Sequence, residues 1–242
     1  MRLDQELVKR GLCESRTEAQ ELIESGSVLV NGAVTTKQTK QVTDTDNIEV
    51  ISRRKFVSRG GEKLEGILLD IFGTGEKAKE FCFGKTALDI GSSTGGFTDY
   101  LLQSGVAHVD AVDVGTMQLH PKLRSDSRVC LFENTDIRNF KSDKGYDIVV
   151  ADLSFISLQS VFETIHTFGI KGSHYFLLIK PQFEVGKGNT KKGIVKDEEI
   201  VQKVLSEYVS LAEKFDMEDV QVFPCCIQGG DGNQEYFLYA KK

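Results

Sequence analysis

The sequence contains no apolar run long enough to cross a membrane. No stretch of its 242 residues approaches the roughly 18 consecutive apolar residues that a spanning helix needs. Its start, Met-Arg-Leu-Asp-Gln-Glu-Leu, interleaves charged and apolar side chains and lacks the apolar region of a signal peptide. Internal repeats and low-complexity tracts are also missing. These absences predict a cytoplasmic globular protein with no membrane partner.

Cysteines are few and follow no pairing or metal-binding pattern. They are odd in number and include no Cys-x-x-Cys spacing: Cys13, Cys82, Cys130, Cys225 and Cys226. A disulfide framework or a zinc site would require such a pattern. We therefore expect free, buried thiols and no metal.

Basic residues are outnumbered, 30 against 36 acidic, and the net charge of -6 argues weakly against a nucleic-acid partner. Their distribution is uneven, however. One basic stretch contains Arg53, Arg54, Lys55, Arg59 and Lys63, and a second contains Lys187, Lys191, Lys192 and Lys196. Such clusters also occur on ordinary solvated surfaces, so they gain meaning only beside a functional site.

The first 52 residues predict a small α+β module. Residues 3–10 and 15–26 have the pattern of two helices, and the second opens with the capping box Ser15-Arg16-Thr17-Glu18. Asn31-Gly32 stands between two short apolar runs, as in a type I′ hairpin, and residues 47–51 predict a further strand. A module of about 50 residues is suited to binding and is too small for an enzyme core.

From Lys85 onward, the pattern predicts a Rossmann-like α/β fold. Short apolar runs alternate with helix-length segments, which is typical of a parallel sheet covered on both faces: residues 86–90, 108–112, 128–132, 146–151 and 175–179. Residues 61–72 predict an extra helix, Asp197 caps a long one, and a closing pair of strands follows at 219–223 and 235–240. We expect domains at 1–52 and 61–242, joined by a basic linker at 53–60.

A glycine-rich loop, Asp89-Ile90-Gly91-Ser92-Ser93-Thr94-Gly95-Gly96-Phe97, follows the first strand of this sheet and leads into a helix. Open α/β sheets bind ligands at this position. The loop has neither the Gly-Lys-Ser/Thr ending of a P-loop nor the spacing of a dinucleotide-binding motif, so no phosphate is expected. Its glycines should let the backbone approach a ligand closely, with Asp89 near a sulfonium or amino group.

Further acids end the strands that follow. Asp113 lies where an acid commonly binds ribose hydroxyls, and Asp136 is placed to accept a hydrogen bond from an adenine amine. The set predicts S-adenosylmethionine as cofactor, bound on the seven-stranded sheet of a methyltransferase by Asp89, Gly91, Ser92, Thr94, Gly95, Gly96, Phe97, Asp113, Asp136 and Asp152.

Asp152 and Lys180 end the fourth and fifth strands, so both side chains emerge at the ligand-binding edge. Burial and neighbouring cations favour the neutral form of a lysine, which can then act as a base. Asp152 alone is equally consistent with a helix N-cap, and Lys180 with a rim lysine.

The glycine loop, Asp-Leu-Ser-Phe at 152–155, Ile-Lys-Pro-Gln-Phe-Glu at 179–184 and Gly-Asn-Gln-Glu-Tyr-Phe-Leu at 232–238 together resemble the TlyA family of rRNA 2′-O-methyltransferases. The catalytic domain of that family is similar to FtsJ, and the N-terminal module resembles the αL RNA-binding motif. The resemblance covers essentially the whole chain. It implies transfer of a methyl group to a cytidine 2′-hydroxyl in ribosomal RNA, either free or in an assembled subunit.

The resemblance also implies a catalytic tetrad of Lys63, Asp152, Lys180 and Glu235. In such a set a neutral Lys180 takes the proton of the 2′-hydroxyl while the other three set its position and charge. Phe155 is expected either to stack on the target nucleotide or to pack in the core. We expect RNA to contact the module, the linker and the lysine-rich loop through Arg2, Arg16, Arg53, Arg54, Lys55, Arg59, Lys187, Lys191 and Lys192.

Three alternatives and one question stay open. Residues 152–155 occupy the strand end where amino-methyltransferases hold an Asn/Asp-Pro-Pro-aromatic motif, although both prolines are absent here. A second alternative is an RNA-binding protein without catalysis. A third is a membrane-active protein, as the haemolysin name of the family suggests. The chain begins almost at the first predicted helix, without the basic extension of longer members, which leaves open whether one or both ribosomal subunits are substrates.

Overall fold

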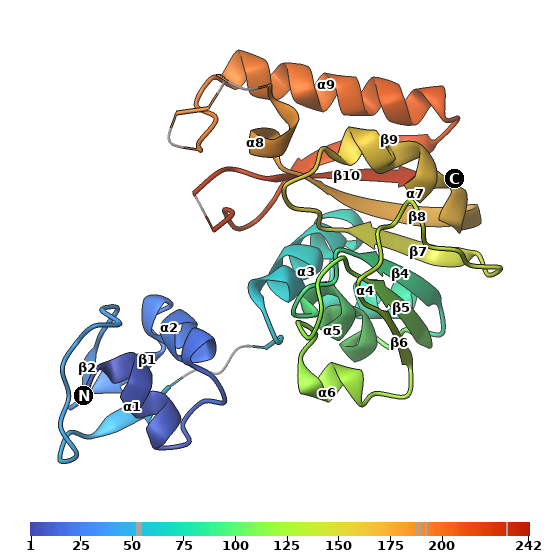
Figure 1. Cartoon of the computed structure of the whole chain (residues 1–242). Helices are drawn as coiled ribbons and strands as arrows, with labels where there is room; N and C mark the ends of the chain where they lie inside the picture. Colours follow the sequence, from blue (N-terminus) through green and yellow to red (C-terminus); the bar gives the residue numbers. More distant parts are fainter. Residues whose placement is uncertain (52–54, 187, 189, 192, 231) are drawn as a thin grey trace. The chain divides into compact units, whose positions relative to one another are not determined.

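The computed structural model describes residues 1–51, 55–186, 188, 190–191, 193–230 and 232–242 (Figure 1). The chain divides into two compact units, Met1–Lys55 and Phe56–Lys242. The first unit has one hydrophobic core, and the second has one on each face of its sheet.

The first unit contains the predicted two helices and small sheet. Its strands are antiparallel in the order β2-β1-β3, and its elements are α1 (Leu3–Lys9), α2 (Arg16–Glu24), β1 (Val28–Val30), β2 (Ala33–Val34) and β3 (Ile48–Val50). The Ser15 hydroxyl accepts from the Glu18 backbone N–H at 3.1 Å, which caps α2. Asn31 and Gly32 have φ of 52° and 79°, so both turn residues are left-handed, as a type I′ hairpin requires.

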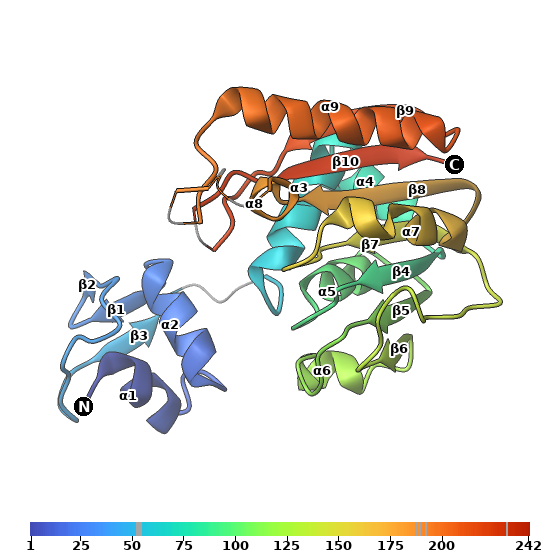
Figure 2. The same cartoon turned by 45° about the horizontal axis from the view of Figure 1, so that its top comes forward.

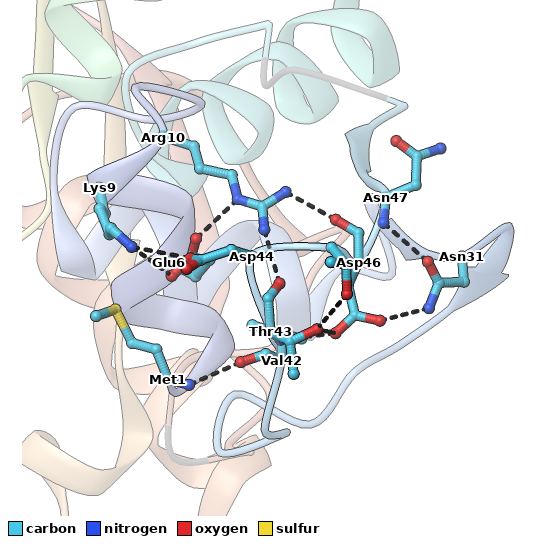
Figure 3. A network of polar contacts seen from close by, with 11 residues as sticks. Met1, Glu6, Lys9, Arg10, Asn31, Val42, Thr43, Asp44, Asp46 and Asn47 are labelled. Atoms are coloured by element: carbon cyan, nitrogen blue, oxygen red, sulfur yellow. Dashed lines mark hydrogen bonds and ion pairs between the residues drawn. The ribbon is translucent and has the colours of Figure 1, made fainter.

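A polar network joins α1 to the loop before β3 (Figure 3). Arg10 donates to Glu6 at 2.8 Å and to the carbonyl oxygens of Thr43 and Asp46 at 2.9 and 2.8 Å. The Asp46 carboxylate accepts from Asn31 in the hairpin turn at 2.6 Å. This network holds a loop with few apolar side chains against both the helix and the hairpin.

The second unit is built on a seven-stranded sheet in the order β6-β5-β4-β7-β8-β10-β9. Its strands are β4 (Thr86–Ile90), β5 (His108–Val112), β6 (Val129–Phe132), β7 (Tyr146–Ala151), β8 (Gly169–Ile179), β9 (Glu218–Pro224) and β10 (Tyr236–Lys241). The first five are parallel, and β10 is antiparallel to both neighbours. The predicted α/β fold with a late pair of strands is confirmed.

Helices cover both faces of the sheet, as Figures 1 and 2 show. One face packs against α3 (Arg59–Phe72), α4 (Gly75–Cys82), α5 (Gly96–Gln103) and α6 (Pro121–Arg124), and the other against α7 (Phe162–Phe168) and α9 (Glu198–Lys214). Alternate strand residues enter the two cores, with Ala87 in one and Leu88 in the other. The short helices η1 (Leu158–Val161) and α8 (Pro181–Glu184) follow the ends of β7 and β8.

The second unit starts earlier in the chain than the expected boundary at residue 61. Helix α3 begins at Arg59, and Phe56 is buried with its ring edge-on to Tyr100. The Val57 N–H also donates to the Asp99 carboxylate at 2.8 Å. Residues 56–60 of the predicted linker are therefore packed on the second unit, because Phe56 is buried and Val57 partly buried there.

Candidate active site

The carboxyl ends of β4 and β7 lie where the strand order of the sheet reverses. A doubly wound sheet opens a crevice at such a point. Two adjoining cavities occupy it, and Gly91, Ser93, Asp152 and Ser154 line both. Every predicted cofactor residue except Gly95 lines one or both of them.

The larger cavity, of ≈ 310 Å³, combines apolar walls with two acids. Its apolar lining comes from Ile90, Val112, Val114, Ile137, Leu153, Phe155, Ile156 and Val161. Asp113 and Asp136 also line it. Apolar walls with a few polar groups are suited to an aromatic heterocycle joined to a ribose.

The two acids of this cavity are held in different ways. Asp113 accepts from the backbone N–H groups of Ser93 and Gly115 at 2.8 and 2.6 Å, which orients its carboxylate. Asp136 accepts from the Arg138 side chain, with Nε at 2.9 Å, and this pairing lowers the pKa of Asp136 to about 2. Arg138, which sequence reasoning missed, thus already occupies the carboxylate that was expected to bind an adenine amine.

The smaller cavity, of ≈ 160 Å³, is lined by two residues with a buried polar atom that has neither a hydrogen-bond nor an ion-pair partner among the described residues: Asp89 Oδ1 and Ser92 Oγ. Asp89 is 1% exposed, and its other oxygen accepts from the backbone and hydroxyl of Thr98 at 3.0 and 2.6 Å. Burial raises the pKa of Asp89 to about 7, and the charges of Asp152 and Asp113 add to the rise. A cationic group in this cavity would satisfy the free carboxylate oxygen.

The glycines of the loop are also needed for contacts within the protein. A Cβ on Gly96 would lie 2.3 Å from Ser58 Oγ and 2.8 Å from the Gly61 backbone nitrogen. A Cβ on Gly95 would lie 2.3 Å from a Leu123 methyl. Gly96 therefore lets the first turns of α5 and α3 touch, and this contact brings α3 to the cavity.

The predicted tetrad is assembled at the mouth of the smaller cavity from four separate segments. Lys63 extends from α3, Asp152 follows β7, Lys180 follows β8 and Glu235 precedes β10. Lys180 Nζ lies 2.6 Å from Asp152 Oδ1, and Lys63 Nζ lies 2.6 Å from Glu235 Oε2 and 3.6 Å from Asp152 Oδ2. Asp152 therefore stands between the two lysines.

Charge in this cluster is balanced, with two amines facing two carboxylates. Burial lowers the pKa of Lys63, but the charges of Asp152 and Glu235 outweigh it and keep that pKa above its ordinary value. Lys63 thus stays an ammonium. Lys180 is 9% exposed at its side chain and also donates to the Ser154 hydroxyl at 2.8 Å, a contact that sequence reasoning missed.

Phe155 lies at the mouth of the larger cavity and is 91% exposed, so the expectation of core packing is wrong. Its backbone has φ of 65°, a conformation that non-glycine residues seldom adopt. Its ring lies 5.3 Å from that of Phe183, whose centroid is 6.0 Å from Lys180 Nζ. The exposed Phe155 ring and the half-buried Phe183 ring form an aromatic pair beside the tetrad.

The predicted RNA-binding residues lie in different surroundings. In the first unit, Arg2 and Arg16 both bind the buried carboxylate of Asp4, at 3.0 and 2.8 Å, which sequence reasoning missed. In the second unit, Arg59 starts α3 and the exposed Lys191 lies in the loop before α9. Lys55 ends the first unit, while Arg53, Arg54, Lys187 and Lys192 lie outside the described residues.

The strand order and the cavity at its reversal point define a Rossmann-like methyltransferase. Residues 56–242 match the FtsJ-like methyltransferase family, and residues 1–48 match the S4 domain. The chain is 38% identical to "Hemolysin A" of Brachyspira hyodysenteriae over 99% of both chains. It is 40% identical to the "16S/23S rRNA (cytidine-2'-O)-methyltransferase TlyA" of Mycobacterium tuberculosis, over 99% of this chain and 89% of that one.

A solved structure shares the fold of the whole chain. A putative hemolysin from Streptococcus thermophilus is 34% identical, with a TM-score of 0.75, covering 100% of this chain and 88% of that one. The chain belongs to the TlyA family of FtsJ-like methyltransferases. Among the described residues, no helix has the length and apolar character needed to cross a bilayer, and no three His, Cys, Asp or Glu side chains are grouped to bind a metal.

Proposed function

We propose that this enzyme transfers a methyl group from S-adenosylmethionine to the 2′-hydroxyl of a cytidine in ribosomal RNA. The observation that supports it most is the tetrad, in which Asp152 links two buried lysines at the edge of the cofactor cavity. The mycobacterial relative is named for this reaction, which supports the choice of substrate.

The residues of the two cavities fit this cofactor. Asp89 and Ser92 each present an unpartnered buried oxygen to the smaller cavity, suited to the amino acid end and its cationic groups. Asp113, held by backbone N–H groups at the wall of the larger cavity, is suited to bind ribose hydroxyls, and the apolar walls suit an adenine ring. When bound, the cofactor supplies a methyl group activated by a sulfonium.

The tetrad supplies a base. A 2′-hydroxyl is a weak acid, so its oxygen attacks the methyl carbon effectively only as its proton leaves. Lys180 in its neutral form would accept that proton, and the residues of the two cavities would hold the sulfonium methyl donor beside the attacking oxygen. Proton uptake restores the balance of two cations and two carboxylates, which favours the transfer in a buried site. Asp152 orients Lys180, and Lys63 with Glu235 holds Asp152.

We propose that the exposed ring of Phe155, supported by Phe183, holds the target nucleotide. Phe155 beside Asp152 offers a ring face to a base that has left its stack, and such stacking contributes about 1–3 kcal/mol. Phe155→Ala is therefore expected to raise the KM for RNA by about tenfold or more, with a smaller loss of cofactor affinity because Phe155 also lines the larger cavity.

We further propose that the basic residues bind the surrounding RNA. The S4 domain supports this for Arg2 and Arg16, whose side chains stay 34% and 52% exposed while Asp4 orients them. Lys55, Arg59 and Lys191 extend the proposed contacts, together with the four residues outside the described part of the chain, Arg53, Arg54, Lys187 and Lys192.

The test is incubation of purified protein and labelled S-adenosylmethionine with unmethylated ribosomal subunits, followed by digestion to nucleosides and mass spectrometry. Label in 2′-O-methylcytidine is the expected product and also identifies the subunit. Label in a methylated base would instead indicate base methylation, and no label on either subunit or on free rRNA would contradict the proposal.

Two lysine variants make this test specific. Lys180→Ala is expected to reduce transfer by at least a hundredfold, because a general base contributes that much, with cofactor affinity within a few-fold. Lys241→Ala is the matched control: its ion pair with Asp219 has the same 2.6 Å length as that of Lys180, but it lies at the opposite end of the β10–β8 pair. Comparable activity of the Lys180→Ala variant would eliminate the proposed base.

A further inference from the structure

Asn233 connects two loops at the edge of the active site. It lies two residues before Glu235 and is 2% exposed. Its side-chain oxygen accepts from the Val195 backbone N–H at 3.0 Å, and its side-chain nitrogen donates to the Gly193 carbonyl at 3.0 Å. Both side-chain hydrogen bonds therefore join Asn233 to backbone groups about 40 residues earlier in the chain, and neither involves a residue of the tetrad.

The segment that Asn233 holds is a closed turn in the lysine-rich loop. Lys191 and Ile194 exchange backbone hydrogen bonds of 2.9 and 3.2 Å, and Gly193 between them has φ of 80°. Lys191 and Lys196 flank this turn, both are exposed, and the sequence has no acid from Val185 to Lys196. The turn therefore presents positive charge, and the nearest acids along the sequence, Glu184 and Asp197, lie outside it.

The other side of the connection is the segment that leads into β10. The Asn233 backbone oxygen accepts from the Gly229 N–H at 2.9 Å, which closes the turn before β10. Tyr236 then pairs with Ile179 across β10 and β8, so Glu235 and Lys180 lie at adjacent strand ends. The side-chain amide of Asn233 is planar and is hydrogen-bonded at both of its polar atoms. It therefore fixes both the distance and the orientation of the lysine turn relative to the ends of β8 and β10.

We propose that Asn233 is a positioning residue that holds the lysine-rich turn beside the tetrad, so that Lys191 and Lys196 bind phosphates of the RNA next to the target ribose. The inference rests on the proposed RNA substrate. Without the Asn233 amide, two backbone groups lose their partners and the turn is released, so Lys191 and Lys196 are no longer held in place and their two phosphate contacts are lost.

The experiment measures binding of the full-length protein to a fluorescein-labelled 30-nucleotide single-stranded RNA over a series of salt concentrations. Asn233→Ala is expected to weaken binding about tenfold and to reduce the slope of log Kd against log salt by about 1.4, since each lost phosphate contact contributes about 0.7. Gln234→Ala is the matched control, because its amide donates only to Cys225 and Glu235 within its own segment. It is expected to keep the wild-type affinity and slope.

A double-mutant cycle tests whether Asn233 acts on RNA binding by positioning the lysines or through a general effect on the structure. Lys191→Ala with Lys196→Ala should also weaken binding about tenfold, and adding Asn233→Ala should cost little more, because the lysines it positions are gone. A hundredfold loss in the triple variant would overturn the proposal, as would a wild-type salt slope for Asn233→Ala.

Folding is checked by titration with S-adenosylhomocysteine, whose affinity should stay within twofold. If Asn233→Ala fails this check, Gly193→Ala disturbs the same turn from its own side: its φ of 80° is unfavourable for alanine, although no atom lies within 4 Å of the added Cβ. It should reproduce the reduced salt slope, and an unchanged slope would refute the inference. Because these readouts need no methyl transfer, a protein that shows them without methylating any subunit would contradict only the proposed reaction.

Discussion

Replacement of Asp89 by asparagine should stabilise the protein above neutral pH while weakening its cofactor binding. Asp89 is 1% exposed, has one oxygen without a hydrogen-bond partner, and has its pKa raised to about 7 by burial. Ionising such a carboxylate costs free energy when no cation is near it. Binding of a cationic ligand offsets that free energy.

The magnitude follows from the difference between the folded and unfolded pKa. In the unfolded chain Asp89 titrates near 3.8, so between pH 3.8 and about 7 the native state binds one more proton than the unfolded state. Stability contributed by protonated Asp89 is complete below pH 3.8 and is lost as pH rises through 7. At 1.36 kcal/mol for each tenfold change in the equilibrium, the loss has an upper limit of about 4 kcal/mol.

Asparagine at position 89 removes this pH dependence of stability and leaves a smaller destabilisation that does not change with pH. Its amide oxygen still accepts from Thr98, but its NH₂ group faces the position of Oδ1, where no acceptor is available, at a cost of about 1–3 kcal/mol. The Asp89→Asn protein should therefore be less stable than the wild type at pH 4.5 and more stable by about 1–3 kcal/mol at pH 8.5.

Calorimetric unfolding of both proteins from pH 4.5 to 8.5 measures this crossover, followed on the transition of the second unit. Calorimetric titration with S-adenosylmethionine gives the functional side: wild-type affinity should rise by up to tenfold per pH unit toward pH 7, and that of the variant should be lower and nearly flat. A stability difference that stays constant across this range would show that Asp89 does not titrate there, and the reasoning would be refuted.

Three further predictions concern packing and charge. Gly96→Ala should destabilise the second unit by about 3 kcal/mol or more in chemical unfolding, because its Cβ meets backbone, whereas Gly60→Ala, whose nearest contacts are 3.4–3.5 Å, should change stability by less than about 1 kcal/mol. Glu235→Gln removes one of the two carboxylates that face the Lys63 ammonium, so the free energy of unfolding should fall by about 2–3 kcal/mol. Turnover in the methylation assay should also fall at least tenfold. Equal turnover would exclude a role for this carboxylate. Asp4→Asn should lower the stability of the first unit by about 2 kcal/mol at pH 7 and by less near pH 3, because its arginine partners lower the pKa of Asp4 and that stabilisation is lost as pH falls below about 4; a loss independent of pH would contradict this assignment.

Much of the fold was predictable because the signals are local. The turn at Asn31-Gly32 and the cap at Asp197 depend on hydrogen bonds between near neighbours, which a short stretch of sequence determines. Buried parallel strands appear in the sequence as apolar runs, and β4, β5 and β7 have the bounds expected for them. Asp152 and Lys180 could be placed at the active edge because parallel strands end together.

The sequence by itself thus determined the elements, the α/β class and the edge of the sheet where chemistry takes place. Only the tertiary structure decided which distant groups meet: Lys63 and Glu235 are 172 residues apart and 2.6 Å from each other. The same holds for the Gly96 contact that brings α3 to the site and for Asn233 on the lysine-rich turn. Such contacts depend on how helices and loops pack across the sheet, and no local periodicity or capping pattern encodes that packing.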